Sequence, residues 1–266
     1  MATTSVYVPA AAHPHRILTS SALRQAEAFT RSVLALLGLG LRVPDHTALS
    51  RRGRTFAGRQ PRVRASGGPV HLVLDSTGLE PFGQGEWWAA KHGRARRRWM
   101  KLHLGVDAAT GEIVAYVRTD GHADDAAQVP DLLRQPEGDI TSLTADGAYD
   151  GDLVYQAAAT RQPGRPPEVV IPPRSSAVLS ATDPGEQSPR DRHIQLMSQH
   201  GRMAWQRMTG YGRRNAAETA VGRYKRLIGP RLRARNVAAQ AGEVALAVQV
   251  LNRMIRQAKP VMVRRT

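Results

Sequence analysis

The sequence predicts an α/β fold: a mixed five-stranded sheet flanked by helices, with a small N-terminal helical region. Two observations lead to this prediction. Short apolar or alternating segments of strand length occur between residues 70 and 171, first joined by a turn and later separated by helical segments. Apolar side chains at helical spacing precede and follow this block. The 266 residues suffice for one large domain with a helical appendage.

Two helices are expected before the sheet. Residues 19–37 repeat apolar side chains every three or four positions, and glycines end the pattern. A shorter helix begins after Asp45, whose side chain can cap its first turn, and ends in a basic segment that contains Arg51 and Arg52. A helix, a turn and a short basic helix are typical of a DNA-docking unit, but a brace packed on the next domain has the same pattern.

A domain boundary is expected after these helices, where a basic linker at residues 59–64 is followed by Gly67 and Gly68. We therefore predict two domains. Residues 1–65 form a helical region that is a candidate for DNA binding. Residues 66–266 form the α/β domain, which also contains the candidate catalytic residues described below.

The α/β block has a defined order of elements. The predicted strands are residues 70–75, 99–106, 113–117, 140–146 and 169–171. The predicted helices are residues 124–134, 150–161, 191–208, 213–228 and 237–257. Three strands connected by hairpins, followed by alternating helices and strands, form a mixed sheet with helices on its faces. This is the order of elements in the ribonuclease-H-like fold.

The charge balance indicates a polyanionic partner. Lys and Arg total 38 against 22 Asp and Glu, a formal net charge of +16, which favours nucleic acid. An anionic membrane fits less well because no basic helix has a bulky apolar face, and an Arg-rich genome composition would explain part of the excess. The absence of cysteine excludes thiolate metal sites and cysteine nucleophiles. With no signal peptide or long apolar run, a cytoplasmic protein is expected.

Two aspartates follow predicted strands and are candidate metal ligands. Asp75 ends the first predicted strand, and Asp146 ends the fourth. Ligands bind at strand ends in open α/β sheets, and two carboxylates brought together there repel each other unless a cation lies between them. Oxygen ligands favour Mg²⁺ or Mn²⁺. Each aspartate taken alone also fits an ordinary turn after a strand.

A third carboxylate lies on a late helix. Arg214, Glu218 and Lys225 are spaced four and seven residues apart, which places them along one face of that helix. Glu218 also fits a capping box with Asn215, and a stripe of surface ion pairs has the same spacing. Together with Asp75 and Asp146, however, Glu218 completes a set of three carboxylates. Such a set can hold two divalent ions that activate a water or a 3′ hydroxyl and stabilise the leaving oxygen of a phosphodiester.

These motifs resemble those of a known family. Residues 72–79 around Asp75 and residues 144–150 around Asp146 are similar to the first two motifs of DDE-class insertion-sequence transposases. The third set matches the Tyr-(2)-Arg-(3)-Glu-(6)-Lys signature of the insertion sequence 5 branch, within the insertion sequence 4/5 superfamily. Its members here are Tyr211, Arg214, Glu218 and Lys225. Residues 22–29 and 43–47 extend the resemblance toward the N-terminus.

The resemblance implies a ribonuclease-H-like catalytic domain that cuts and joins double-stranded DNA at transposon ends with two Mg²⁺ or Mn²⁺ ions. It implies that Asp75, Asp146 and Glu218 are catalytic metal ligands. It also implies that Tyr211, Arg214 and Lys225 contact DNA. Because two ends must be paired, a homodimer on DNA is expected. In the basic run at residues 94–98, Arg96 and Arg97 are further candidates for phosphate binding, although such runs are often solvated surface.

Members of this branch generally carry more helical sequence before the segment equivalent to residue 22, so an N-terminally shortened chain is expected. Two other functions share these residues. One is a DNA-binding protein that has lost catalysis. The other is a metal-dependent nuclease that cuts but does not join.

Overall fold

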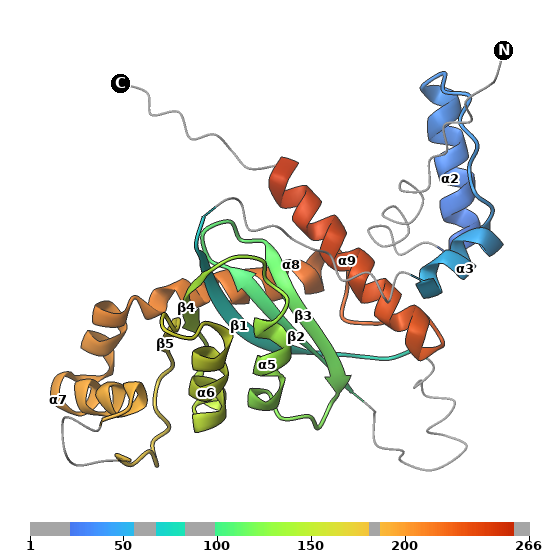
Figure 1. The fold of residues 1–266 in the computed structure, drawn as a ribbon. Coiled ribbons are helices and arrows are strands. Elements are labelled where there is room, and N and C mark those ends of the chain that lie inside the picture. Colours follow the sequence, from blue (N-terminus) through green and yellow to red (C-terminus); the bar gives the residue numbers. More distant parts are fainter. Residues whose placement is uncertain (1–21, 56–67, 83–98, 181–186, 258–266) are drawn as a thin grey trace, which may run out of the picture. The chain divides into compact units, whose positions relative to one another are not determined.

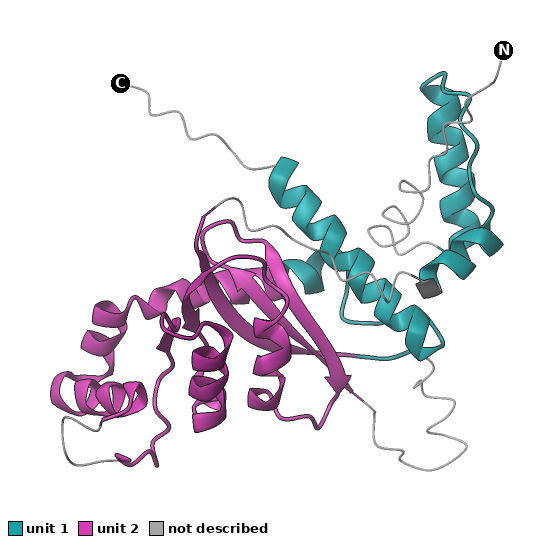
Figure 2. Ribbon diagram, viewed as in Figure 1, with its two compact units in different colours: residues 1–61, 80–97, 223–266 teal, residues 62–79, 98–222 magenta. Residues whose placement is uncertain are grey.

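The structure, a computed structural model, describes residues 22–55, 68–82, 99–180 and 187–257 (Figure 1). The chain divides into two compact units (Figure 2). The first, called the sheet unit, comprises residues 62–79 and 98–222. The second, called the helical unit, comprises residues 1–61, 80–97 and 223–266. No helix among the described residues is long and apolar enough to cross a membrane.

The sheet unit contains a mixed five-stranded sheet in the order β3-β2-β1-β4-β5. The strands are β1 Val70–Leu79, β2 Met100–Asp107, β3 Ile113–Asp120, β4 Ile140–Thr144 and β5 Glu168–Val170. The central strand β1 pairs antiparallel with β2 and parallel with β4. Of the outer pairs, β2–β3 is antiparallel and β4–β5 is parallel. The predicted α/β class and mixed five-stranded sheet are confirmed, and the arrangement is consistent with the ribonuclease-H-like fold.

One face of the sheet is covered by two helices, α5 Val129–Leu133 and α6 Asp152–Arg161 (Figure 1). Alternate side chains of β1 point to this face because successive residues of a strand face opposite ways. The buried cluster includes Val70, Leu72, Leu74, Leu132, Leu133, Val154 and Ala158. Burying each Leu or Val stabilises the fold by roughly 1.5–3 kcal/mol. Packing of these side chains against α5 and α6 therefore holds β1 in place.

The first strand is longer than predicted. Its expected end at Asp75 is wrong, because β1 continues to Leu79. Ser76 to Leu79 keep their partners on β2, where they pair with His103 to Met100, although the parallel pairing with β4 stops at Val73. Pairing with β2 therefore extends β1 past Asp75. Asp75 lies inside β1, just beyond the point where pairing with the other neighbouring strand, β4, stops.

Other predicted elements changed in detail. The single helix expected over residues 124–134 is a short 3₁₀ turn, Ala126–Gln128, followed by α5. Pro130 in the first turn of α5 has no N–H to donate, which suits a helix start better than a helix interior. The helix expected over residues 213–228 begins as a 3₁₀ turn, Tyr211–Arg214, and continues as α8 Asn215–Leu227.

The helix α7 Pro189–Thr209 precedes this turn and is interrupted in its middle. Its first turn is capped by Ser188, which accepts from the backbone N–H of Asp191, with a reciprocal bond from Asp191. Gly201 has φ 77° and ψ 163°, which no helical residue adopts. The helix ends at Gly210, whose φ of 65° lies in the left-handed region that glycine adopts without strain.

The helical unit contains α2 Leu23–Leu36, α3 His46–Thr55, α9 Val237–Gln257 and the end of α8. The predicted cap at Asp45 is confirmed, since its Oδ1 accepts from the Ala48 backbone N–H at 2.7 Å. Asn236 caps α9 in the same way, with a bond of 2.8 Å from Ala239. Within this unit α3 packs against α9, so the two ends of the described chain are brought together.

Candidate active site

The register of two parallel strands places Asp75 and Asp146 side by side. Val73 of β1 pairs with Thr144 of β4, and each aspartate comes two residues after its member of this pair. Because side chains alternate along a strand, equal offsets from a paired position direct the two side chains to the same face at the same edge of the sheet.

Asp146 combines two roles. Its Oδ1 accepts from the backbone N–H of Ala148 at 2.9 Å and so caps the 3₁₀ turn Gly147–Tyr149. Its Oδ2 is directed to Arg214 at 3.6 Å. Because a carboxylate has two oxygens, Asp146 can stabilise the turn with one oxygen and still offer the other to the candidate site.

Arg214 connects all three predicted carboxylates. One guanidinium nitrogen, Nη2, lies 3.9 Å from Asp75 Oδ1 and 3.6 Å from Asp146 Oδ2. The other, Nη1, pairs with Glu218 Oε1 one helical turn later. The 3₁₀ turn that carries Arg214 lies against β1 and β4. A carboxylate on β1, one after β4 and one on α8 thus converge on one cation.

The electrostatics of the site favour a cation. Burial raises the pKa of Asp75, and Asp146 and Glu218 raise it further, while the Ser76 backbone N–H and Arg214 act in the opposite direction. The Asp75 side chain is 17% exposed, whereas Glu218 is 53% exposed. Burial and nearby carboxylates therefore make the negative charge on Asp75 costly unless a positive charge lies beside it.

The oxygen donors of this site suit a hard divalent ion such as Mg²⁺ or Mn²⁺. Among the described residues, no group of three or more Asp, Glu or His side chains is already spaced to hold an ion. Arg214 lies among the three carboxylates instead, at 3.6 and 3.9 Å from the two aspartates. The charge and the donor set fit a divalent ion, provided that the Arg214 side chain moves.

The remaining predicted DNA-binding residues are distributed over the chain. Tyr211 begins the 3₁₀ turn that carries Arg214, and burial raises the pKa of its hydroxyl. Lys225 follows on α8, in the part of that helix that belongs to the helical unit. Arg51 and Arg52 lie on α3 of the helical unit. The two arginines of the basic run, Arg96 and Arg97, lie outside the described residues.

A fourth carboxylate near the site was missed by the sequence analysis. Asp125 accepts from Lys101 Nζ at 3.1 Å and from Ser76 Oγ at 3.2 Å, and it lies 3.3 Å from Nδ1 of the buried His103. Asp125 lies in the first turn of the helix predicted over residues 124–134, where the sequence indicates no functional role for it. Its partners on β1 and β2 are far away in sequence, so no local pattern indicates them.

The pKa of Tyr149 is sensitive to the charges of these carboxylates. Burial raises the pKa of Tyr149, and the charges of Asp125, Asp146 and Asp75 raise it further, in that order. The ring is buried. Tyr149 therefore stays protonated and places an uncharged hydroxyl group where several carboxylates act on it.

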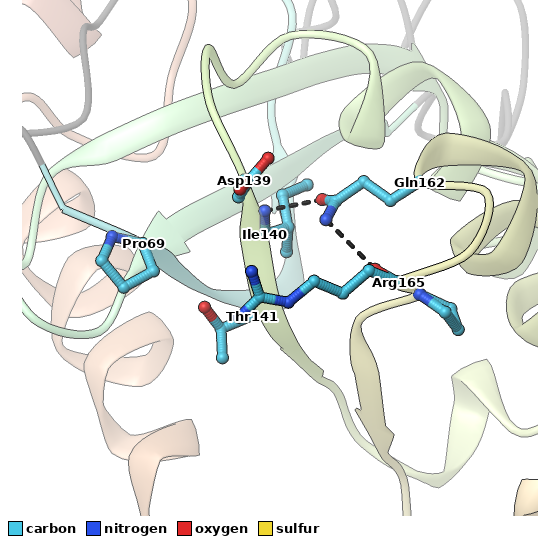
Figure 3. Close-up of a pocket in the computed structure, with 7 residues that line it drawn as sticks. Pro69, Asp139, Ile140, Thr141, Gln162 and Arg165 are labelled. Atoms are coloured by element: carbon cyan, nitrogen blue, oxygen red, sulfur yellow. Dashed lines mark hydrogen bonds between the residues drawn. The ribbon is translucent and has the colours of Figure 1, made fainter.

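A small cavity of about 80 Å³ lies elsewhere in the sheet unit (Figure 3). It is lined by Pro69, Asp139, Ile140, Thr141, Gln162, Arg165 and Pro166. Gln162 accepts from the Ile140 backbone N–H at 2.6 Å and donates to the Arg165 carbonyl at 3.3 Å. The cavity adjoins the starts of β1 and β4. Asp75 and Asp146 come after the last residues that pair between these strands, so the cavity is not part of the carboxylate site.

Two known families match parts of this chain. Residues 66–253, well over half of the chain, match a family described as the transposase DDE domain. Residues 7–84 match a second family with the same description. The first match contains the strands β1 to β5 and all three carboxylates. The chain therefore belongs to the family of DDE-domain transposases.

Proposed function

We propose that this protein is an insertion-sequence transposase that cleaves DNA at transposon ends and transfers the freed strand to target DNA. The observation that supports this most directly is the convergence of Asp75, Asp146 and Glu218 on the single cation of Arg214. Carboxylates gathered in this way serve metal-dependent phosphodiester chemistry. The stability of the fold alone does not require three carboxylates to meet around one arginine.

In this proposal Asp75 and Asp146 hold two Mg²⁺ or Mn²⁺ ions, and Glu218 completes the second position. When bound, such ions lower the pKa of an attacking hydroxyl group and neutralise charge on the phosphodiester. Asp146 can bind through Oδ2 while Oδ1 keeps the Ala148 cap. Glu218, which is half exposed, is free to turn toward an ion once Arg214 releases it.

Two steps are expected at the phosphorus atom. In the first, the oxygen of water forms a bond to phosphorus and the bond to the 3′ oxygen breaks, leaving a 3′ hydroxyl at the transposon end. In the second, that hydroxyl attacks a phosphorus of target DNA in line, and the 3′ oxygen of the target strand leaves. The residues of the chain orient these groups and hold the charges, which is how phosphoryl transfer is mainly catalysed.

Arg214 is proposed to exchange its carboxylate partners for a DNA phosphate, which its guanidinium binds through two parallel donors. Tyr211 is proposed to contact DNA near the cut, and Lys225 to bind a DNA phosphate. Further phosphate contacts are assigned to Arg51, Arg52, Arg96 and Arg97. The net charge of +16 supports a large electrostatic share in DNA binding.

The match of Tyr211, Arg214, Glu218 and Lys225 to the full signature supports membership of the insertion sequence 5 branch. Residues 1–65 are proposed to bind the transposon ends and residues 66–266 to carry out catalysis. A homodimer is proposed on DNA, because two ends must be held together. The protein is proposed to act at the bacterial nucleoid, where its substrate lies.

The proposal is tested with labelled duplexes taken from the two flanks of the gene, incubated with the protein and Mg²⁺, with a chelator as control. Nicked ends followed by joined strands are expected. Cleaved ends without joined strands would instead indicate a nuclease. Binding without cleavage, with or without Mn²⁺, would indicate a DNA-binding protein that has lost catalysis.

A further inference from the structure

A buried histidine of α7 is held between two partners that fix its protonation. His193 Nε2 lies 2.7 Å from the carbonyl oxygen of Val169 on β5. The Trp205 Nε1–H donates to His193 Nδ1 at 3.0 Å. A carbonyl can only accept and an indole N–H can only donate. His193 must therefore be the neutral tautomer with its proton on Nε2, and both of its nitrogens are satisfied.

This contact requires the interruption of α7. His193 and Trp205 are 12 residues apart, which along a straight helix would separate them by about 18 Å. The non-helical conformation of Gly201, with φ 77°, lets the second half of α7 fold back (Figure 1). A side chain at this φ is strained, so Gly201 is what permits the hydrogen bond between His193 and Trp205.

The second partner of Trp205 is Tyr211. The two ring centroids lie 5.1 Å apart and the rings are tilted by 49°, while His193 meets Trp205 edge-on at 5.7 Å. Trp205 is fully buried, so its ring is enclosed by these neighbours and the surrounding chain. Thr209 Oγ1 donates to the Trp205 carbonyl at 2.8 Å and closes the last turn of the helix.

Tyr211 is the first residue of the 3₁₀ turn that ends in Arg214. The turn packs against α7, β1 and β4. Movement of Tyr211 would therefore shift the backbone of Arg214. It would also change the direction of α8, which carries Glu218. A continuous series of contacts runs from Val169 through His193, Trp205 and Tyr211 to the carboxylate site.

We infer that His193 and Trp205 are positioning residues that hold the turn Tyr211–Arg214, and with it Arg214 and Glu218, against Asp75 and Asp146. This inference rests on the proposed function, because it assigns these two side chains a role in that site. Both side chains are buried, so neither is placed to contact DNA or the reacting atoms directly. Both act through the ring of Tyr211.

The test uses variants that each remove a different part of this arrangement. Trp205→Phe keeps an aromatic ring but removes the N–H together with the rest of the five-membered ring, which leaves His193 Nδ1 without its donor. His193→Leu removes both hydrogen bonds, and His193→Gln restores one donor and one acceptor. Gln162→Leu is the matched control, because it removes a partly buried hydrogen bond to the start of β4, which is the end of that strand away from the carboxylates.

Two readouts are used on the full-length protein. The first is the Nε–H NMR signal of Arg214, assigned with Arg214→Lys, together with the imidazole nitrogen shifts of His193. The second is strand cleavage, separated into kcat and KM. The NMR readout needs no catalysis, so failure of the proposed function would leave it intact.

We expect wild-type His193 to show the Nε2–H tautomer. In Trp205→Phe and His193→Leu, the Arg214 signal is expected to shift or broaden and kcat to fall between about tenfold and a hundredfold with little change in KM. His193→Gln is expected to recover most of the loss, and Gln162→Leu to lower the unfolding temperature only. An unchanged Arg214 signal in both disrupting variants, or an equal change in Gln162→Leu, would overturn the inference.

Discussion

Nη2 of Arg214 lies 3.6 Å from Oδ2 of Asp146, so that its positive charge is close to a carboxylate on β1 and to one that follows β4. The same nitrogen is 3.9 Å from Asp75. A guanidinium and a divalent ion cannot both occupy this position, because they repel each other and need the same oxygens. Metal binding at the proposed site would therefore be linked to the position of Arg214.

The first prediction concerns Arg214→Gln. Removing the competing positive charge is expected to tighten Mn²⁺ binding by at least about tenfold, since like charges near 4 Å interact by several kcal/mol in a protein environment. Strand cleavage is expected to fall, because the phosphate contact is lost as well. Isothermal titration calorimetry measures the affinity for Mn²⁺. Arg213→Gln is the control, and weaker Mn²⁺ binding in Arg214→Gln would contradict the linkage.

The second prediction concerns the carboxylates themselves. Asp75→Asn and Glu218→Gln keep the shape of each side chain and remove its charge, so at least about a thousandfold loss of strand cleavage is expected with the fold intact. Gel-shift measurements should show that binding of end DNA persists, because phosphate contacts supply most of the affinity. Joining of ends by Asp75→Asn at a near wild-type rate would refute the assignment of the site.

The third prediction is a pH dependence of stability. Burial lowers the pKa of His193 despite its bond to the Val169 carbonyl and the nearby charges of Glu168 and Asp150. In the unfolded chain His193 binds a proton as the pH falls through about 6.5, whereas in the folded chain it binds that proton only at lower pH. Stability must fall as the pH drops below about 6.5, with a slope of at most about 1.4 kcal/mol per pH unit for this one group.

Urea unfolding between pH 5.5 and 7.5 measures this dependence. His193→Gln cannot titrate, so its stability curve is expected to be flatter than that of the wild type on the acidic side. Identical acidic slopes for the two proteins would show that His193 binds its proton equally well in the folded state. The difference between the proteins isolates His193 from the other histidines.

The fourth prediction concerns a buried ion pair. Arg190 donates to both oxygens of Asp150, at 2.7 and 3.0 Å, and the backbone N–H of Arg174 adds a bond of 3.0 Å. Asp150 is buried, so Arg190→Leu would leave a charge without its partner and is expected to cost about 3–5 kcal/mol in urea unfolding. Arg134→Leu, which breaks an exposed pair with Asp131, should cost less than about 1 kcal/mol.

Local signals carried most of the fold prediction. The caps at Asp45 and Asn236 lie within three residues of the N–H groups they accept from, so sequence alone indicates them. The extent of β1 beyond Asp75 depends on its pairing with β2, about 25 residues later, and no local pattern reports it. The reversal at Gly201 was also missed, because a single glycine is tolerated in a helical pattern.

The candidate site divides in the same way. The types and spacings of Asp75, Asp146 and Glu218 are visible in the sequence, and the i, i+4 spacing of Arg214 and Glu218 predicts their pairing. The approach of Arg214 to the two aspartates is not visible, because it depends on the packing of one 3₁₀ turn on two strands. The roles of Asp125 and His193 depend on partners at least 12 residues away.

The packing of α3 against α9 has a consequence for synthesis of the chain. At about 5–20 residues per second, α3 leaves the ribosome between about 10 and 40 s before its partner is complete. During that interval the first helices of the nascent chain lack the surface on which they pack, and Glu218 has only begun to emerge when most of the interval has passed. Until residue 257 has been made, the nascent chain therefore has no finished helical unit, and until residue 218 has been made it lacks the third of the three carboxylates.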